Sequence, residues 1–157
     1  MKKVNEHVLS ILVDNEVGVL TRIINAVRRE GCNIKSVTAA RTMDKKYARI
    51  TINVESYDYM IADIIAKIRA LSCVRSLQKY EEESFVEREY AIFSVIDECA
   101  QAQEVINKYD AHKIRDCIYE LTGDRKTISA CVAELSGIAE VEIARTGSII
   151  LHLPEGE

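Results

Sequence analysis

The chain of 157 residues is 48% hydrophobic and 29% charged, with six Gly and one Pro; this composition is typical of one ordinary folded domain or two small ones and excludes a disordered chain. Its net charge of −4 is unevenly divided, because residues 1–80 carry 14 Lys and Arg against 8 Asp and Glu, whereas residues 81–157 carry 7 against 17. The basic residues of the first half are scattered and not interleaved with aromatic side chains, which argues against a nucleic-acid partner and favours two domains with different surfaces.

The elements of the first half follow from changes in the hydrophobic period. The apolar run His7–Val13 predicts a buried strand, and the helical spacing of apolar residues from Val19 predicts a helix that stops at Gly31. Two more strands are predicted at Asn33–Arg41 and Tyr47–Val54, with a turn at residues 42–46 between them.

A second helix is predicted after Asp58, which we expect to cap it, and residues 73–80 predict a weaker fourth strand. The order strand, helix, strand, strand, helix, strand predicts an α+β fold. In it, residues 1–80 form a ferredoxin-like βαββαβ sandwich with both helices on one face of the sheet and the other face free.

Residues 81–87 are predicted to be a linker, because three consecutive acids repel one another and have poor strand propensity. Residues 88–157 then predict a second small α+β domain with the same theme. Its expected elements are a strand at 88–96, a helix at 98–109, an extended segment at 112–121, a helix from Asp124 to Gly137, and strands at 139–147 and 148–153.

No signal of catalysis, cofactor binding or membrane insertion is present. The histidines lack metal-ligand spacing, the glycines form no phosphate- or dinucleotide-binding motif, and no apolar run approaches the ~20 residues of a membrane span. Residues 1–10 are not a secretory signal, and the five scattered cysteines are typical of free thiols, so we expect a cytoplasmic protein with no cofactor and no membrane partner.

Two further motifs are given structural interpretations. Cys32 has no identifiable basic partner, so a buried thiol is favoured over a nucleophile. The run Glu87-Arg88-Glu89 begins a predicted strand and is interpreted as an exposed or interface ion pair.

The junction DNEVGVL, Asp14–Leu20, carries an acid, an amide and a lone glycine between the first strand and the first helix. The unpaired N–H groups at that helix end can receive a carboxylate, Gly18 permits close approach, and Asp14 or Asn15 can accept from an ammonium group. A capped turn without a ligand is the alternative. We expect the strand from Asn33 to lie beside the strand ending at Val13, so that Asn15, Gly18 and Asn33 converge on one edge.

The segments ILVDNEVGVLTRI and REGCNIKSVT resemble the ACT domain of acetolactate synthase small (regulatory) subunits. FVEREYAIFSV and EVEIARTG resemble two segments of the second domain of those subunits. Val17 stands where the family often has Pro or Ser, and the second domain is shorter than usual around residues 111–124.

The resemblance implies a non-catalytic subunit that binds the large, thiamine-diphosphate-dependent subunit, raises its activity and confers feedback inhibition by valine. It also implies a homodimer through the ACT domains, with the effector at their interface. The family's effector residues fall on Asn15, Gly18 and Asn33. A stand-alone amino-acid-sensing ACT protein is a second hypothesis, and a small enzyme ranks third because no acid–base pair is present.

Overall fold

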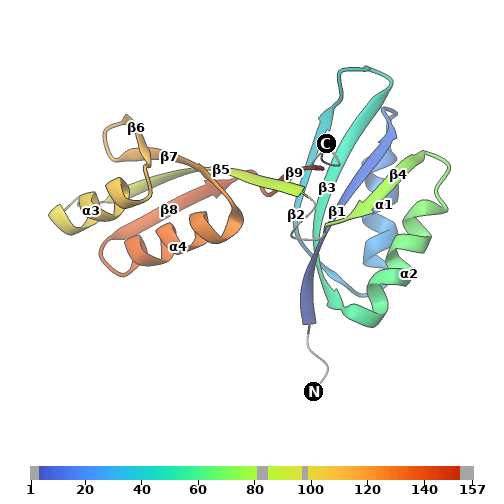
Figure 1. Ribbon diagram of the computed structural model, residues 1–157, viewed down its shortest axis with the longest axis horizontal. Coiled ribbons are helices and arrows are strands. Elements are labelled where there is room, and N and C mark those ends of the chain that lie inside the picture. Colours follow the sequence, from blue (N-terminus) through green and yellow to red (C-terminus); the bar gives the residue numbers. More distant parts are fainter. Residues whose placement is uncertain (1–3, 81–84, 97–98, 153–157) are drawn as a thin grey trace, which may run out of the picture. The chain divides into compact units, whose positions relative to one another are not determined.

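The computed structural model describes residues 4–80, 85–96 and 99–152 (Figure 1). These residues form two compact units, one that runs to Val86 and also takes in the chain from Ile150, and one that spans Glu87–Ile149. Each unit contains an antiparallel sheet and two helices, which confirms the predicted α+β class. Among the described helices, none has the length and apolar character needed to cross a membrane.

The first unit has the predicted βαββαβ order, and its sheet order is β2-β3-β1-β4. α1 and α2 lie on the same side of this sheet (Figure 1). The elements are β1 (Val4–Asp14), α1 (Val19–Arg28), β2 (Asn33–Arg41), β3 (Tyr47–Tyr57), α2 (Asp58–Arg69) and β4 (Val74–Lys79).

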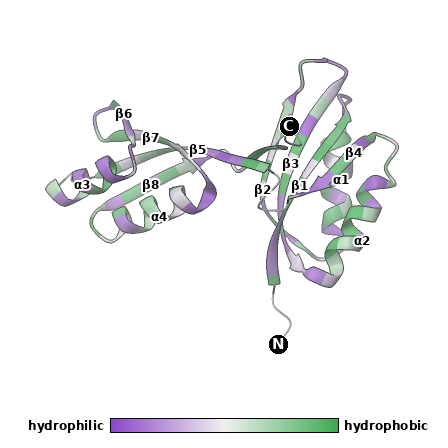
Figure 2. Cartoon of the chain, viewed as in Figure 1, coloured by the Kyte–Doolittle hydropathy of each residue, from purple (hydrophilic) through white to green (hydrophobic). Residues whose placement is uncertain are grey.

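Alternation along the strands and helical spacing along the helices place one apolar set inside the first unit. Every second residue of β1 and β3 is buried against the helices, and Figure 2 shows hydrophobic and hydrophilic residues alternating along α2. The buried set includes Leu9, Ile11, Val13, Ile23, Val27, Ile50, Ile52, Val54, Ile64 and Ile68.

The prediction that the strand from Asn33, β2, lies beside the strand ending at Val13, β1, is wrong. β2 pairs with β3, from Asn33 opposite Glu55 to Arg41 opposite Ala48, and β3 separates β2 from β1. The physical reason is the short turn after Arg41, which makes β2 and β3 a hairpin, while the helix α1 between β1 and β2 leaves room for a strand to insert between them.

The predicted cap of α2 is also wrong. Tyr57 occupies the N-cap position and makes no side-chain cap hydrogen bond, because β3 runs three residues past its predicted end and leads directly into the helix. Asp58, the first residue of α2, instead accepts two hydrogen bonds from Nδ2 of Asn5, at 3.0 and 2.9 Å.

The face of the first sheet opposite the helices is not free, contrary to expectation. Val8 on that face is 4% exposed and packs with Phe85 and Ile150, which belong to the same unit. Thr51 and Asn53 of β3, on the same face, are also buried. Phe85 falls within the predicted linker, but the part of residues 81–87 that the structure describes lies in a strand.

The second unit has sheet order β6-β7-β5-β8, with β9 also pairing with β5. The predicted start of the first helix at residue 98 and the linker residues 81–84 lie outside the described residues. The elements from Phe85 onward are β5 (Phe85–Ile96), α3 (Ala100–Lys108), β6 (His112–Arg115), β7 (Ile118–Gly123), α4 (Arg125–Ser136), β8 (Glu140–Arg145) and β9 (Ile149–His152). The first two residues of β5 and all of β9 after Ile149 belong to the first unit.

Two local features of the second unit differ in how well they were predicted. The helix predicted to start at Asp124 is α4, and Asp124 is its N-cap residue: its Oδ1 accepts from the Thr127 N–H at 2.6 Å, and this hydrogen bond lowers the pKa of Asp124. The extended segment 112–121 instead contains a hairpin turn, in which Cys117 takes a φ of 59°.

Glu89 is buried, so the interpretation of its motif as an exposed or interface ion pair is wrong for this residue. Its side chain is 3% exposed and accepts from Nε and Nη2 of Arg145, while its other oxygen accepts from Ser148 Oγ at 2.9 Å. The ion pair between Glu89 on β5 and Arg145 on β8 therefore links these two neighbouring strands.

Candidate functional site

The loop between β1 and α1 is attached to the turn between β2 and β3. The backbone N–H of Asn15 donates to the carbonyl of Lys46 at 2.8 Å, and its Nδ2 donates to the carbonyl of Lys45 at 2.9 Å. Among the described residues, the side-chain oxygen of Asn15 has no hydrogen-bond partner. This oxygen can therefore accept from an ammonium group, and the role expected of Asn15 stays a prediction.

Gly18 is the N-cap residue of α1 and adopts the left-handed conformation, with φ 82° and ψ −3°. No side chain caps this helix and its first turn holds no acidic residue, so the N–H groups of Leu20 and Thr21 are available to a ligand. A Cβ at Gly18 would meet no other atom within 4 Å. The open space in front of a positively polarised helix end suits a carboxylate.

Asp14 is not available to an ammonium group. Its carboxylate accepts from Nε and Nη2 of Arg75 at 2.7 and 2.5 Å, and this hydrogen-bonded pair raises the pKa of Arg75. Of the two acceptors considered for this loop, Asn15 is the one that remains.

Asn33 is exposed at the first position of β2, and its Nδ2 donates to Oε2 of Glu55 at 3.0 Å. Lys35 donates to the other oxygen of the same carboxylate at 3.0 Å. The pKa of Glu55 is lowered, first by the hydrogen bond from Asn33 and then by the one from Lys35. Asn33 thus carries an amide oxygen that is oriented by an anionic neighbour.

Within one protomer the three predicted residues do not converge. Asn15 lies beside Lys46, just before β3, whereas Asn33 lies opposite Glu55, near the other end of that strand. At ~3.3 Å per residue the two ends are roughly 30 Å apart, because β3 is extended between them. Asn15 and Gly18 share one loop, and Asn33 stands alone at the far end of an edge strand.

Two apolar side chains beside the loop were not predicted as part of the site. Val17 is fully exposed at 100%, and Leu20 is 41% exposed although it lies in the first turn of α1. The sequence signal was present, since Leu20 falls outside the Val19, Ile23, Val27 stripe that faces the core. Their position next to the open helix end offers an apolar contact to an aliphatic ligand or a partner chain.

The other candidate chemistries receive no support. Cys32 is half-buried, its Sγ lies 3.7 Å from the carbonyl of Glu30, and burial raises the pKa of the thiol, which disfavours the nucleophilic thiolate. Over residues 4–80, 85–96 and 99–152, no three His, Cys, Asp or Glu side chains group as a metal site.

Comparisons with known proteins agree on one family. Residues 9–76 match the family model described as AHAS small subunit-like ACT domain. The chain is 30% identical to a probable acetolactate synthase small subunit from Archaeoglobus fulgidus, over 93% of this chain and 96% of that protein. It is 29% identical to the acetolactate synthase small subunit of Aquifex aeolicus, over 96% of this chain and 82% of that protein.

A solved structure of similar length has the same fold. The crystal structure of the acetolactate synthase small subunit from Thermotoga maritima superposes with a TM-score of 0.81 at 27% identity, covering 97% of this chain and 99% of that one. The likeness therefore extends through both units, and the nearly complete coverage of both chains gives no support to the expected shortening around residues 111–124.

Proposed function

Because the chain belongs to the family of acetolactate synthase small subunits, we propose that it is a regulatory subunit without catalytic activity of its own. It binds the thiamine-diphosphate-dependent catalytic subunit, raises its activity, and makes it sensitive to feedback inhibition by a branched-chain amino acid, most simply valine. Residues 1–80 are the ACT regulatory domain that binds the effector, and residues 88–157 form the second domain.

The effector site is completed by a second protomer. β2 lies at the edge of its sheet, and no strand among the described residues pairs with its outer side; such edges readily pair with another strand. Antiparallel pairing of two β2 strands about a two-fold axis aligns the Asn33 end of one with the Arg41 end of the other. Arg41 lies opposite Ala48, at the same end of the sheet as Asp14 and the Gly18 loop.

This arrangement brings Asn33 of one protomer toward the loop of its partner. The loop is already held against the β2–β3 turn by the hydrogen bonds of Asn15, which places it near the same edge. The effector carboxylate is received by the N–H groups of Leu20 and Thr21 beyond Gly18, Asn15 accepts from its ammonium group, and Val17 and Leu20 contact its aliphatic side chain.

The observation that carries the proposal is the uncapped, left-handed Gly18 at the start of α1, with open space before it and no acidic residue in the first turn. Of the described helices, α4 alone has a side-chain cap, at Asp124, which is typically worth about 1 kcal/mol. What distinguishes α1 from α2 and α3 is therefore the left-handed glycine and the open space beside it. The absence of such a cap at α1 leaves its N–H groups for a ligand.

The test is acetolactate formation by the catalytic subunit with and without this chain, titrated with valine. We expect stimulation by the wild-type chain and inhibition by valine, and we expect the Asn33→Ala variant to keep the stimulation but lose most of the inhibition. The amide contact is worth roughly 1–3 kcal/mol, which is about a fivefold to 150-fold loss of effector affinity.

The outcomes separate the alternatives. Loss of stimulation and inhibition together in a dimeric, folded Asn33→Ala variant would mean that one surface serves both roles. Should the wild-type chain bind valine without stimulating a cognate catalytic subunit, the stand-alone sensor replaces the regulatory subunit.

A further inference from the structure

The sheet of the second unit has a face that its helices do not cover. Alternate residues of β5, namely Ala91, Phe93 and Val95, are buried in the cluster that α3 and α4 complete. Ile92 and Ser94 therefore point to the opposite side of the sheet. Ile92 is 39% exposed, although it lies in the middle of a central strand.

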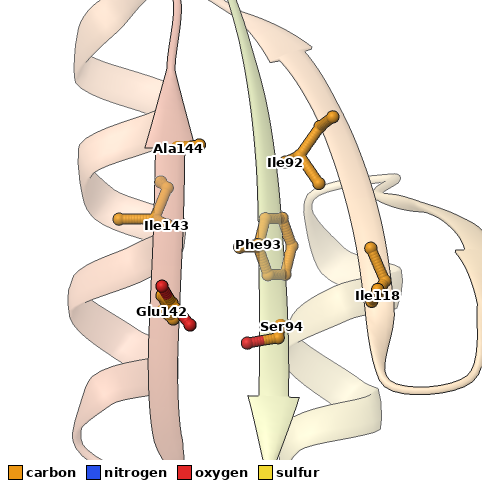
Figure 3. A pocket seen from close by; sticks show the side chains of 7 residues that line it. All are labelled: Ile92, Phe93, Ser94, Ile118, Glu142, Ile143 and Ala144. Carbon is orange, nitrogen blue, oxygen red and sulfur yellow. The ribbon is translucent and has the colours of Figure 1, made fainter.

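A shallow hollow of about 200 Å³ lies on this face, across β7, β5 and β8 (Figure 3). The register explains it, because Ser94 stands between Ile118 and Glu142, and Ala144 stands beside Ile92. The two small side chains, Ser94 and Ala144, leave a depression that the two isoleucines wall with apolar groups. The hollow has the size and character to accept one large apolar side chain.

Acidic side chains outnumber basic ones around the hollow, where Arg115, opposite Ile118, is the cation beside the lining residues that the structure describes. Glu142 lines it, and Glu140 lies two residues away on the same strand and the same face. Both are exposed, and neither carboxylate has a hydrogen bond or an ion pair with any other residue that the structure describes. Glu120, opposite Ile92, adds a third negative charge and accepts from the hydroxyl of Tyr90 at 2.5 Å.

We infer that this face docks a segment of the catalytic subunit that presents an apolar side chain between Lys or Arg residues. The inference rests on the proposed function and adds where the partner binds. Protein-binding surfaces commonly have an apolar centre and a polar or charged rim, and carboxylates without a partner favour binding of a cationic segment.

A second copy of the same chain fits this face less well. A two-fold axis through the hollow would bring Glu142 of both copies toward each other, with Glu140 of both nearby, and like charges at such an interface repel. The effector residues Asn15, Gly18 and Asn33 all belong to the first unit, so a docking face on the second unit also accounts for separable stimulation and inhibition.

The test measures binding of the full chain to the purified catalytic subunit by biolayer interferometry, together with stimulation of acetolactate formation. Glu142→Arg reverses a charge at the hollow and Ser94→Leu fills it, and each is expected to weaken binding tenfold or more. Glu142→Gln keeps the volume and should weaken binding only a few-fold. Glu104→Arg is the matched control, because Glu104 is an exposed acid on α3, and it should bind like the wild type.

Thermal unfolding and valine binding of each variant are recorded alongside, and folded variants should keep both. If the wild-type chain binds the catalytic subunit and the Glu142→Arg and Ser94→Leu variants bind it equally well, the inference is overturned and the proposed function stays intact. A wild-type chain that neither binds nor stimulates the catalytic subunit removes the proposed function and the inference with it. A changed particle mass in Glu142→Arg, with unchanged binding to the catalytic subunit, would assign the face to a second copy and overturn the inference.

Discussion

Replacing Gly18 by Ala separates two roles of the glycine, its backbone conformation and the space in front of it. With φ 82°, the residue sits where an L side chain is disfavoured by roughly 1–2 kcal/mol. An added Cβ meets nothing within 4 Å in the protomer, so no clash adds to this figure. The expected loss of folding stability is therefore roughly 1–2 kcal/mol. For a domain of about 80 residues, each kcal/mol lowers Tm by about 4–8 °C.

Effector binding is expected to respond differently. If the carboxylate of valine approaches the first turn of α1 through the open space at Gly18, the new methyl group stands in its path. We then expect valine affinity to fall at least tenfold, beyond what the loss of stability explains, since the variant remains folded at 25 °C. Isothermal calorimetry with valine and urea unfolding of the same preparation give the two numbers.

Gly31→Ala is the stability control for this prediction. Gly31 has φ 69° and also has nothing within 4 Å of a Cβ, so it should lose a similar stability in urea. The reasoning is refuted if Gly18→Ala shows the strain cost but binds valine like the wild type, because the space before the helix would then be unused.

Three further predictions concern assembly, the buried charge and pH. The chain should be a dimer at micromolar concentration in size-exclusion chromatography with light scattering. Val37→Pro on the edge strand β2 should make it monomeric, because proline blocks strand pairing at an edge. A monomeric wild-type chain would contradict the two-protomer site. Arg145→Met should lower the free energy of unfolding by roughly 3–5 kcal/mol, because it leaves the buried carboxylate of Glu89 unpaired. Arg75→Met, at an exposed pair, should cost far less, and equal effects of the two variants in urea would argue against a buried charge. The pKa of His7 is lowered, chiefly by burial, so on acidification the unfolded chain takes up a proton near pH 6.5, before the folded chain does. The free energy of unfolding should therefore fall as the pH drops below about 6.5. A His7→Gln variant should show a flatter dependence on pH in urea unfolding between about pH 7 and pH 5.

The local elements of the first unit were predictable because each carries its own signal. The helical stripe from Val19 and the alternation in β3 report which side faces the core, and both were found where expected. The neighbour of β2 is not a local property, and it was predicted incorrectly even though the split βαβ class was right. Inserting β3 between β1 and β2 moves Asn33 far from Asn15, so the site could not be assembled from one chain.

The burial of Phe85 and that of Glu89 were missed for the same reason, because tertiary contacts override local preference. Phe85 follows a run of acids and reads as linker, yet it is buried against Val8 and Ile150, which are distant in sequence. Glu89 reads as a surface acid because its partner, Arg145, lies 56 residues away. The turn before Cys117 carries Asp116 but no glycine, asparagine or proline, so the hairpin between β6 and β7 gave only a weak turn signal.

An effector that contacts two protomers has a direct physical means of regulation. A ligand shifts an equilibrium only through its different affinity for the two states, and a dimer with another arrangement at β2 would offer it only half of the contacts. At a concentration 100 times its Kd, the effector stabilises the competent arrangement by about 2.7 kcal/mol, which is enough to change the dominant state of a balanced equilibrium. Loss of the Asn33 contact removes most of this bias and leaves the effector-free arrangement untouched, which is why stimulation should survive in the Asn33→Ala variant. Reciprocity then requires that binding to the catalytic subunit change the affinity for valine by the same factor by which valine changes the affinity for the catalytic subunit.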